Sequence, residues 1–424
     1  MELFEKNFNP ELYKTDFHWK EGDHDVYRVC HWSAPGCHDS CGILLYVKDG
    51  KLDRVEGDPN QPYNRGRLCM RCLNLPEACN ETLDRLKWPV KRVGERGENK
   101  WERITWDEAY DEIEARVKDI WETDGGNAII CVHGTGRNIN WQVPFFGQAA
   151  LKTPNISTFG FTGFSCYMPR ICGSIAPFGD FPIVDASETH ADRYNNAEWV
   201  PPEVLVVWGN EPLASNADGY VGHWLVQCVQ MGTKVISIDP RLTWWGARAE
   251  YWLQIRPGTD AALGCAWLNV IIEEGLYDAD YVAAWCAGFE ELAASVKDTT
   301  PEWAAEICDL DADDIRGSAR LYANAKPGAI QWGLAFDQQL SAMALCLAGC
   351  DLMAICGNID TPGGWLLVHN AFNVSRGSDN GVKWVDPEAA KKKATMHYVF
   401  NTDGEDFIHQ AASEAVLHCM ETGE

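Results

Sequence analysis

Five cysteines lie close together near the start of the chain, and thiolates are the side chains best suited to soft metals. Cys30, Cys37 and Cys41 come early, and Cys69 and Cys72 follow after a gap. Two centres suit such a set, an iron–sulfur cluster and a zinc ion. The spacing Cys37-x3-Cys41, with one cysteine upstream and another far downstream, favours a cluster, whereas Cys69-x2-Cys72 alone suits zinc equally well. The third alternative is that these cysteines bind no metal.

A β-hairpin is predicted between the early and the late cysteines. The run GILLYVKDGKLDRVEGD occupies residues 42–58 and turns at Lys48-Asp49-Gly50. Asp-Gly between two apolar-rich strands is a strong hairpin signal. Such a hairpin would bring a late cysteine back to the early ones, which is a plausible way to build a four-thiolate site.

This stretch resembles the N-terminus of the molybdenum and tungsten bis-pterin oxidoreductases, the dimethyl sulfoxide reductase family. In that family a cysteine cluster precedes the pattern VxDGxxxxxEGDPxxPxNxGxxCxR/K. The matching residues here are Val47, Asp49, Gly50, Glu56, Gly57, Asp58, Pro59, Pro62, Asn64, Gly66, Cys69 and Arg71. The resemblance continues along the chain from about residue 28 to about residue 370.

The resemblance implies a 4Fe–4S cluster held by four cysteines, Cys30, Cys37, Cys41 and Cys69. It also places Arg71 where the family has the basic residue that lies between the cluster and the pterin. Six residues separate Cys30 from Cys37 in this sequence, whereas the family usually has two or three. Cys72 is therefore the alternative fourth ligand.

The composition is that of a globular protein with a large core. The chain has 424 residues, of which 46% are hydrophobic and 23% charged, enough for two or three domains. Nineteen tryptophans predict aromatic burial or an aromatic-lined pocket. The net charge of −26 argues against nucleic acid as a partner, because nucleic acid binds basic surfaces.

Seventeen cysteines are scattered along the chain, and several lie in apolar helical contexts. Cys346, Cys350 and Cys356 are therefore expected to be reduced core residues rather than disulfides. The N-terminal residues are polar and acidic and carry none of the features of an export signal. No run approaches the ~18 apolar residues of a membrane helix. We expect a cytoplasmic protein without membrane insertion, unless a signal-bearing partner exports it.

The elements that must position these residues follow a pattern of alternating strands and helices. Continuous apolar strands are predicted at 128–134, 203–209, 234–240, 251–258 and 329–336. Helices are predicted at 106–121, 221–232, 260–276 and 341–358, the first after a capping box formed by Thr105 and Glu108. Continuous apolar strands between helices are typical of a parallel sheet with helices on both faces. The predicted fold class is therefore α/β, with a doubly wound, Rossmann-like sheet.

Together the pattern and the resemblance predict three domains. A small 4Fe–4S cluster domain with a β-hairpin occupies 1–95, and an α/β domain with the metal-ligand loop occupies 96–195. Residues 371–424 could return to this second domain. A Rossmann-like domain that binds molybdopterin guanine dinucleotide occupies 196–370. We expect the C-terminal β-barrel domain of the family to be absent, because the family pattern that this sequence matches ends near residue 370.

Three polar turns follow predicted strands, at Trp208–Pro212, Asp239–Arg241 and Arg256–Asp260. Ligands of doubly wound sheets lie at the carboxyl ends of strands. Glycine allows a ligand to approach the backbone, and helix N-termini favour phosphate. A carboxylate can accept two N–H bonds from a guanine edge. Each turn alone is more often plain structure, but three turns at strand ends together favour a ligand site.

The family has the motifs GN-x-P, IDPR and PGTDAAL in the same order and at the same spacing. By that resemblance the three turns bind molybdopterin guanine dinucleotide, with Gly209 and Asn210 near the diphosphate and Asp239 and Asp260 on the nucleotide. The implied cofactor-binding residues are Gly209, Asn210, Pro212, Asp239, Arg241, Gly258, Thr259 and Asp260. The run ICGNIDTPGGW at 355–365 also matches a family motif, although a helix end and a turn explain its glycines equally well.

In the family one protein side chain binds the molybdenum or tungsten, and it lies between the capped helix and the GN-x-P turn. The resemblance implies Cys166 as this ligand, with Ser165 as the alternative, and the surroundings resemble the acetylene hydratase group of cysteine-ligated members. From the residues alone, Cys166 is more often a buried apolar side chain. His133 and Tyr167 are candidate proton donors, although a lone histidine or tyrosine is more often structural.

The function implied by the resemblance is that of a molybdenum or tungsten oxidoreductase. It would move oxygen or hydroxyl, and electrons, on a small-molecule substrate with a 4Fe–4S cluster and one or two molybdopterin guanine dinucleotides. The expected partners are a ferredoxin-like electron-transfer subunit and a separate chain that supplies the missing C-terminal domain. Two alternatives stay open, a non-redox hydratase or transhydroxylase and a non-catalytic electron-transfer or assembly subunit.

Overall fold

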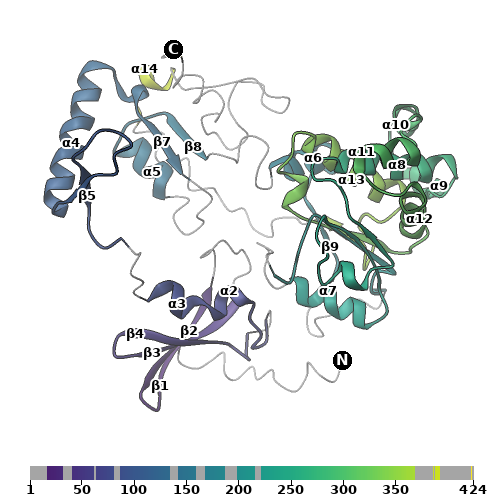
Figure 1. Ribbon diagram of the computed structural model, residues 1–424, viewed down its shortest axis with the longest axis horizontal. Helices are drawn as coiled ribbons and strands as arrows, with labels where there is room; N and C mark the ends of the chain where they lie inside the picture. Colours follow the sequence, from purple (N-terminus) through teal and green to yellow (C-terminus); the bar gives the residue numbers. More distant parts are fainter. Residues whose placement is uncertain are drawn as a thin grey trace.

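The structure is a computed structural model that describes residues 17–31, 41–61, 64–80, 86–133, 142–158, 168–186, 198–214, 221–367, 385, 387–391 and 422. Its elements form three groups, an N-terminal sheet with two short helices, a small α/β group around α4, and a larger α/β group (Figure 1).

The N-terminal group is a four-stranded antiparallel meander. Its strands are β1 (His18–Glu21), β2 (His24–His31), β3 (Cys41–Lys48) and β4 (Lys51–Gly57), in that order. Asp49 and Gly50 form the two-residue loop between β3 and β4, with φ angles of 51° and 74°. Two positive φ angles are what a type I′ hairpin turn requires, so the predicted hairpin is confirmed. The short helices α2 (Met70–Leu73) and α3 (Leu75–Cys79) lie against β4.

The second group contains a β-hairpin, a long helix and a pair of parallel strands. Its elements are β5 (Val90–Arg92), β6 (Trp101–Arg103), α4 (Trp106–Thr123), η2 (Gly126–Ala128), β7 (Ile130–His133), α5 (Gln142–Ala149) and β8 (Asn155–Thr158). Strands β7 and β8 are parallel. The short helix α14 (Pro387–Ala390) contacts η2, so a late part of the chain lies beside this group.

Helix α4 begins as the sequence predicts, but its apolar stripe is not buried. The hydroxyl of Thr105 accepts from the backbone of Glu108, whose side chain accepts from the Thr105 N–H at 2.7 Å, which completes the capping box. Trp106, Tyr110 and Ile113 are each more than half exposed, and none of the residues of α4 is buried. Helical spacing of apolar residues therefore located the helix but did not give the degree of burial.

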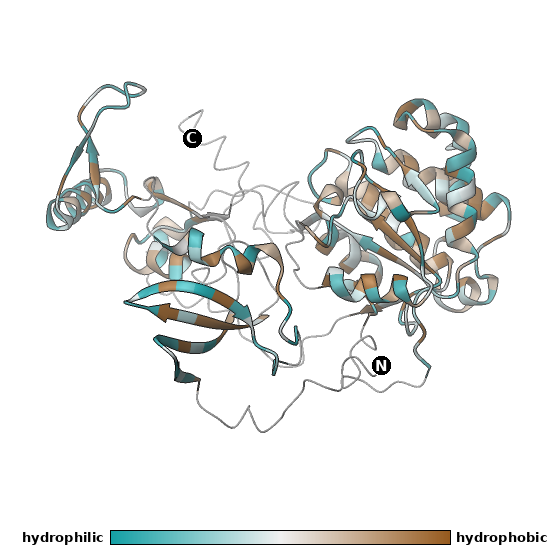
Figure 2. Cartoon of the chain, turned by 60° about the horizontal axis from the view of Figure 1, so that its bottom comes forward, coloured by the Kyte–Doolittle hydropathy of each residue, from teal (hydrophilic) through white to brown (hydrophobic). Residues whose placement is uncertain are grey.

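The third group is organised around a four-stranded parallel sheet in the order β12-β11-β10-β13. The strands are β10 (Val204–Trp208), β11 (Lys234–Ile238), β12 (Tyr251–Leu253) and β13 (Gly328–Trp332). Most residues of these strands are buried, as a sheet covered on both faces requires. Figure 2 shows brown, hydrophobic segments in the strands of this group and also on the helices around them. The predicted doubly wound α/β architecture is confirmed.

Helices surround the parallel sheet. They are α7 (Val221–Gln230), α8 (Asp260–Glu273), α9 (Ala279–Trp285), α10 (Phe289–Val296), α11 (Pro301–Cys308), α12 (Ala312–Ala323) and α13 (Ala342–Ile355), with the short turns η4 (Gly246–Arg248) and η5 (Leu334–Phe336). Helix α6 (Met168–Phe178) packs on α13, and β9 (Pro182–Val184) pairs with β14 (Trp365–Leu367). Part of the segment expected in the 96–195 domain therefore contacts the 196–370 segment.

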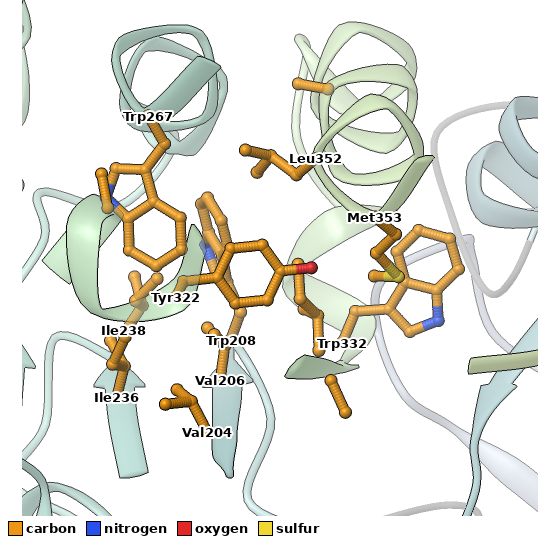
Figure 3. Packing of buried hydrophobic residues seen from close by; sticks show 14 of the residues in the cluster. Val204, Val206, Trp208, Ile236, Ile238, Trp267, Tyr322, Trp332, Leu352 and Met353 are labelled. Carbon is orange, nitrogen blue, oxygen red and sulfur yellow. The ribbon is translucent and has the colours of Figure 1, made fainter. Parts of the chain in front are cut away.

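Aromatic side chains fill the core of this group, as the tryptophan content predicts. The ring centroids of Trp208 lie 5.6 Å from Trp267 and 5.2 Å from Phe336, and Trp267 stacks on Tyr322 at 5.8 Å. Figure 3 shows Trp267, Tyr322 and Trp208 together between the strands and the helices. Offset and edge-to-face pairs at these distances add about 0.5–1.5 kcal/mol each to the burial of the rings.

The buried cysteines of α13 and its C-cap residue behave as core residues. Cys346, Cys350 and Cys356 are fully buried, and all three are free thiols. Burial raises the pKa of the Cys356 thiol to about 12, so the side chain is a neutral thiol in the fold. Within the part of the chain that the structure describes, we find no helix with both the length and the apolar character needed to cross a membrane.

Candidate iron–sulfur and pterin site

Two of the predicted cluster cysteines occupy one side of the N-terminal sheet. Cys41, the first residue of β3, is buried in an apolar cluster with Ile43 and Val55. Cys69 is the N-cap residue of α2 and is half-buried. Cys72, the alternative ligand, belongs to the same apolar cluster as Cys41 and is 1% exposed. Cys37 lies outside the described residues.

The sulfur of Cys69 is in an environment that favours the thiolate. The Cys72 thiol donates a hydrogen bond to it and lowers its pKa most, and the backbone N–H groups of Cys72 and Arg71 and the charge of Arg71 act in the same direction. Together they lower the pKa of Cys69 to about 5, despite the opposing effect of burial. The thiolate is the form that binds a metal.

Cys30 lies on β2, and the strand register separates it from Cys41. It pairs with Gly42, and successive side chains of a strand point to opposite faces. Cys30 therefore shares a face with the side chains of Leu44 and Tyr46, opposite the face of Cys41. It is exposed to solvent.

The described cysteines do not form a zinc site. Among the residues that the structure describes, no three His, Cys, Asp or Glu side chains come close enough to hold a single ion.

The three predicted pterin-binding turns are brought to one edge of the parallel sheet. All four strands run in the same direction, so their carboxyl ends share an edge. The N–H of Gly209 donates to Ile238 O at 2.9 Å, and that of Asp239 donates to Leu253 O at 3.3 Å. The eight residues predicted to bind the cofactor follow the ends of β10, β11 and β12.

The first turn is held by close packing between backbones. Gly209 has φ +56°, and a Cβ on it would lie 2.3 Å from the Cβ of Ala335. The buried Asn210 donates from Nδ2 to Trp332 O at 3.0 Å. The carbonyl of Pro212 lies against Gly222 of α7 in the same way. These contacts join the turn to both β13 and α7.

The two aspartates of the later turns differ in their surroundings. Asp239 Oδ1 accepts from the N–H of Arg241 at 2.8 Å, while the Arg241 side chain is mostly exposed. Asp260, the first residue of α8, accepts from Trp208 Nε1 at 2.9 Å and from Gln339 Nε2 at 3.4 Å. Burial raises the pKa of Asp260. Gly258 has φ +86°, and a Cβ added to it would meet no atom within 4 Å, so its turn is open at that point.

The residues of the 355–365 motif lie at the opposite edge of the sheet. Asn358 Oδ1 accepts from the N–H of Gly328, the first residue of β13, at 3.0 Å. Gly357 has φ +69° and ends α13. The interpretation as a helix end and turn accounts for these residues.

The predicted catalytic residues are only partly within the described ranges. Cys166, Tyr167 and the alternative Ser165 lie outside them. His133 is the last residue of β7 and pairs with Thr158 in the parallel ladder. Arg71 is in α2, two residues after Cys69.

A profile of the molybdopterin oxidoreductase family matches residues 85–419 of this sequence. The chain belongs to this family. A second profile, that of the molybdopterin oxidoreductase Fe4S4 domain, matches residues 32–81. The resemblance seen in the sequence motifs is thereby confirmed, and the family's cofactors are a 4Fe–4S cluster and molybdopterin guanine dinucleotide with molybdenum or tungsten.

Three similar proteins show the range of chemistry in this molybdopterin family. Acetylene hydratase of Syntrophotalea acetylenica is 32% identical over 336 residues, which are 77% of this chain and 43% of that protein. The thiosulfate reductase molybdopterin-containing subunit PhsA of Salmonella typhimurium is 31% identical, over 79% of this chain and 42% of that protein. Dimethyl sulfoxide reductase DmsA of Haemophilus influenzae is 30% identical, over 78% of this chain and 44% of that protein.

A solved structure shares the fold. Acetylene hydratase from Pelobacter acetylenicus matches with a TM-score of 0.66 at 28% identity, over 86% of this chain and 48% of that one. The predicted α/β fold class is confirmed by this match. The chain spans a little under half the length of these molybdopterin-family relatives.

Helix α7 connects the cysteine region with the parallel sheet, although no motif in the sequence points to it. Trp224 packs against the apolar cluster that contains Cys41 and Cys72. The half-buried His223 is close enough to Arg67 and Cys69 for their charges to affect it, and its pKa is lowered, first by burial and then by Arg67. The sequence offers one indirect signal for its position. The helix at 221–232 is the first one predicted after the turn at Trp208–Pro212.

Proposed function

We propose that this chain is the N-terminal portion of a molybdenum or tungsten enzyme that moves oxygen or hydroxyl, and electrons, on a small substrate. The observation that carries the proposal is the position of α7. Its Trp224 packs against the apolar cluster of Cys41 and Cys72, and the charges of Arg67 and Cys69 affect its His223. Gly222 of the same helix packs on the turn after β10. A cluster held by the cysteines and a pterin at the sheet edge would thus be close neighbours.

The residues have distinct proposed roles. Cys37, Cys41 and Cys69 hold the cluster with a fourth thiolate, and Cys166 binds the molybdenum or tungsten. Gly209, Asn210, Pro212, Asp239, Arg241, Gly258, Thr259 and Asp260 hold one molybdopterin guanine dinucleotide. When bound, these groups would supply an electron carrier and a centre for oxygen transfer. The positive charge of Arg71 stabilises the Cys69 thiolate, and Arg71 lies on the proposed route from cluster to pterin.

His133 and Tyr167 are the proposed proton carriers, because oxygen transfer to or from a substrate needs a proton donor within reach. The expected partners are a ferredoxin-like subunit and a chain that completes the second pterin site. A cytoplasmic location stays a prediction from the sequence.

The test is anaerobic purification with whatever chains co-purify, followed by quantification of iron, sulfide, molybdenum, tungsten and pterin. We expect about four irons per chain, pterin, and a paramagnetic signal from the reduced cluster. Protein without iron would refute the proposal. Iron without pterin would favour the non-catalytic alternative.

A second candidate is non-redox hydratase or transhydroxylase chemistry with the same groups. The similarity to acetylene hydratase in sequence and fold supports it. Turnover of a substrate without any electron acceptor would distinguish it, and strict dependence on an acceptor would exclude it.

A further inference from the structure

The apolar stripe of α4 is covered at one end only. Near the C-terminal end of the helix, Trp121 donates from Nε1 to Leu151 O at 2.8 Å, so this end of the stripe packs on its own group. Near the N-terminal end, Trp106, Tyr110 and Ile113 are each more than half exposed. The ring centroids of Trp106 and Tyr110 lie 5.7 Å apart, so the two rings form one continuous apolar surface.

A row of acidic side chains runs beside the exposed end of the stripe. Asp107, Asp111 and Glu114 each follow one residue of the stripe, so the two rows are neighbours on the helix. Helix α4 contains seven acidic and two basic residues. Among the described residues, the ion pairs of this helix involve Glu112 and Glu114, and Asp107 and Asp111 have none. We call these two rows together the acidic stripe.

The β5–β6 hairpin presents the opposite charge. Residues 86–103 contain six basic and three acidic side chains, although the net charge of the whole chain is −26. The ladder pairs Val90 with Arg103 and Arg92 with Trp101, so these four side chains share one face. Trp88 is on the same face, because the guanidinium of Arg103 lies over its ring, 3.8 Å from the centroid. All five side chains are exposed, and we call this surface the Trp–Arg face.

The Trp–Arg face points away from α4 of the same chain. The hairpin lies beside α4 (Figure 1), where Lys91 pairs with Glu112 at 2.7 Å. Successive side chains of a strand point to opposite faces, so Lys91 is on the face opposite Arg92. In the described part of the chain, neither Arg92 nor Arg103 has a carboxylate partner. The hairpin therefore uses its other face for its own helix and leaves the Trp–Arg face uncovered.

The Trp–Arg face and the acidic stripe complement each other. Both carry large apolar side chains, one with arginines and the other with carboxylates. Trp88, Trp101, Trp106 and Tyr110 are each about half exposed, which leaves roughly 400 Å² of aromatic surface on each copy. Uncovered apolar surface of this size marks interaction sites. The two surfaces do not meet within one chain, but a two-fold axis lets each meet its complement on a second copy.

We propose that two copies of this chain form a symmetric dimer in which the Trp–Arg face of each copy lies on the acidic stripe of the other. The indole rings bury the exposed end of the stripe, and the guanidinium groups pair with the carboxylates beside it. Apolar side chains at the centre with charged pairs around them are the usual anatomy of a protein–protein interface. The dimer goes beyond the proposed function and does not depend on the cofactors.

Charge reversal tests this pairing in the full chain, purified anaerobically and studied by analytical ultracentrifugation. The wild type should have twice the mass of one chain. The variant Arg92→Glu/Arg103→Glu and the variant Asp107→Arg/Asp111→Arg should each raise the dissociation constant by ~10-fold or more, because like charges then face each other. An equal mixture of the two variants should recover the wild-type dissociation constant. In the mixed dimer, one contact joins two reversed surfaces and the other joins two unchanged surfaces.

A matched pair of tryptophan variants tests the apolar part of the interface. Trp101→Ala should also weaken the dimer, whereas Trp285→Ala, at an exposed tryptophan of α9, should leave its mass unchanged. A monomeric wild type, a dimer that neither charge reversal weakens, or a mixture that stays monomeric would overturn the proposal. Association of the wild type only with a different, co-purifying chain would assign the two surfaces to that chain and would also overturn it.

Discussion

Arg170 and Asp337 form an ion pair that is buried at the carboxyl edge of the parallel sheet. Arg170 Nε lies 2.8 Å from Asp337 Oδ2, and the two side chains are 2% and 0% exposed. Asp337 Oδ1 also accepts from the Arg170 N–H at 3.0 Å, and Arg170 Nη1 donates to Trp332 O at 3.0 Å. The pair therefore ties the first turn of α6 to the end of β13, which also anchors Asn210.

Removing one partner of this pair should be strongly destabilising. Asp337→Leu leaves a buried guanidinium without its carboxylate, which costs about 3–5 kcal/mol. The free energy of unfolding from urea titration measures the effect. Asp313→Asn, which breaks an exposed pair with Arg316, is the control and should cost less than about 1 kcal/mol. An equal loss in the free energy of unfolding for the two variants would show that the buried pair stabilises the fold no more than a surface pair does.

The same pair should affect the pterin site and leave the cluster intact. Helix α6 begins at Met168, two residues after the proposed ligand Cys166, so loosening α6 loosens the chain beside that ligand. We expect Asp337→Asn, the milder change, to retain less pterin and molybdenum or tungsten than the wild type at an unchanged iron content. Parallel loss of iron and pterin would mean general unfolding.

Gly209 should not tolerate a side chain. Its φ of +56° is unfavourable for alanine, and the added Cβ would meet that of Ala335 at 2.3 Å. The clash adds about 1–3 kcal/mol to the backbone strain of about 1 kcal/mol. Gly275→Ala is the matched control, because Gly275 has φ +65° with nothing within 4 Å and should show the strain alone. Thermal or urea unfolding gives the loss in the free energy of unfolding for each variant. Similar losses for Gly209→Ala and Gly275→Ala would rule out a steric contribution at Gly209.

The sequence alone predicted the elements that neighbouring residues determine. Asp49-Gly50 specified the hairpin because only a few residue pairs accept two positive φ angles, and Thr105 with Glu108 specified the start of α4. Continuous apolar strands between helices specified the parallel sheet, and the sheet's single direction brought Asn210, Asp239 and Asp260 to one edge.

The features that could not be predicted from the sequence depend on the register between strands and on contacts between residues far apart in the chain. A shift of one residue between β2 and β3 would place Cys30 on the face of Cys41, and no local signal fixes that register. The ion pair between Arg170 and Asp337 joins residues 167 positions apart, so neither side chain attracts notice in the sequence. His223 was missed for the same reason, since the neighbouring Cys69 comes from another group of elements.

Cys69 should react as a thiolate below neutral pH in iron-free protein. Its pKa is lowered from 9.0 to about 5, mainly by the hydrogen bond from Cys72, so the alkylation rate should level off above about pH 6. Cys72→Ala removes that bond and should move the inflection to higher pH. The protein is treated with iodoacetamide at a series of pH values from 4 to 9, spaced ~0.5 pH unit apart, and mass spectrometry measures the alkylation of Cys69 at each one. Cys228, whose pKa burial raises to about 12, should stay unlabelled in this range, and an inflection of Cys69 near 9 would contradict the prediction.

Asp351 of α13 should make the protein less stable as the pH rises. Burial raises its pKa from 3.8 to about 6, so between these values the native state holds a proton that the unfolded state has lost. Stability from this group therefore falls as the pH rises through that window and is lowest above about pH 6. The difference corresponds to about 3 kcal/mol. We expect the free energy of unfolding of Asp351→Asn, from urea titration, to exceed that of the wild type by up to this amount at pH 8. The difference between the two should shrink toward pH 4, because the protonated aspartic acid and asparagine are both neutral. Asp111→Asn, on the exposed side of α4, is the control for the same substitution at the surface. A difference that widens at acid pH would mean that the Asp351 carboxylate is stabilised in the fold and that its pKa is lowered.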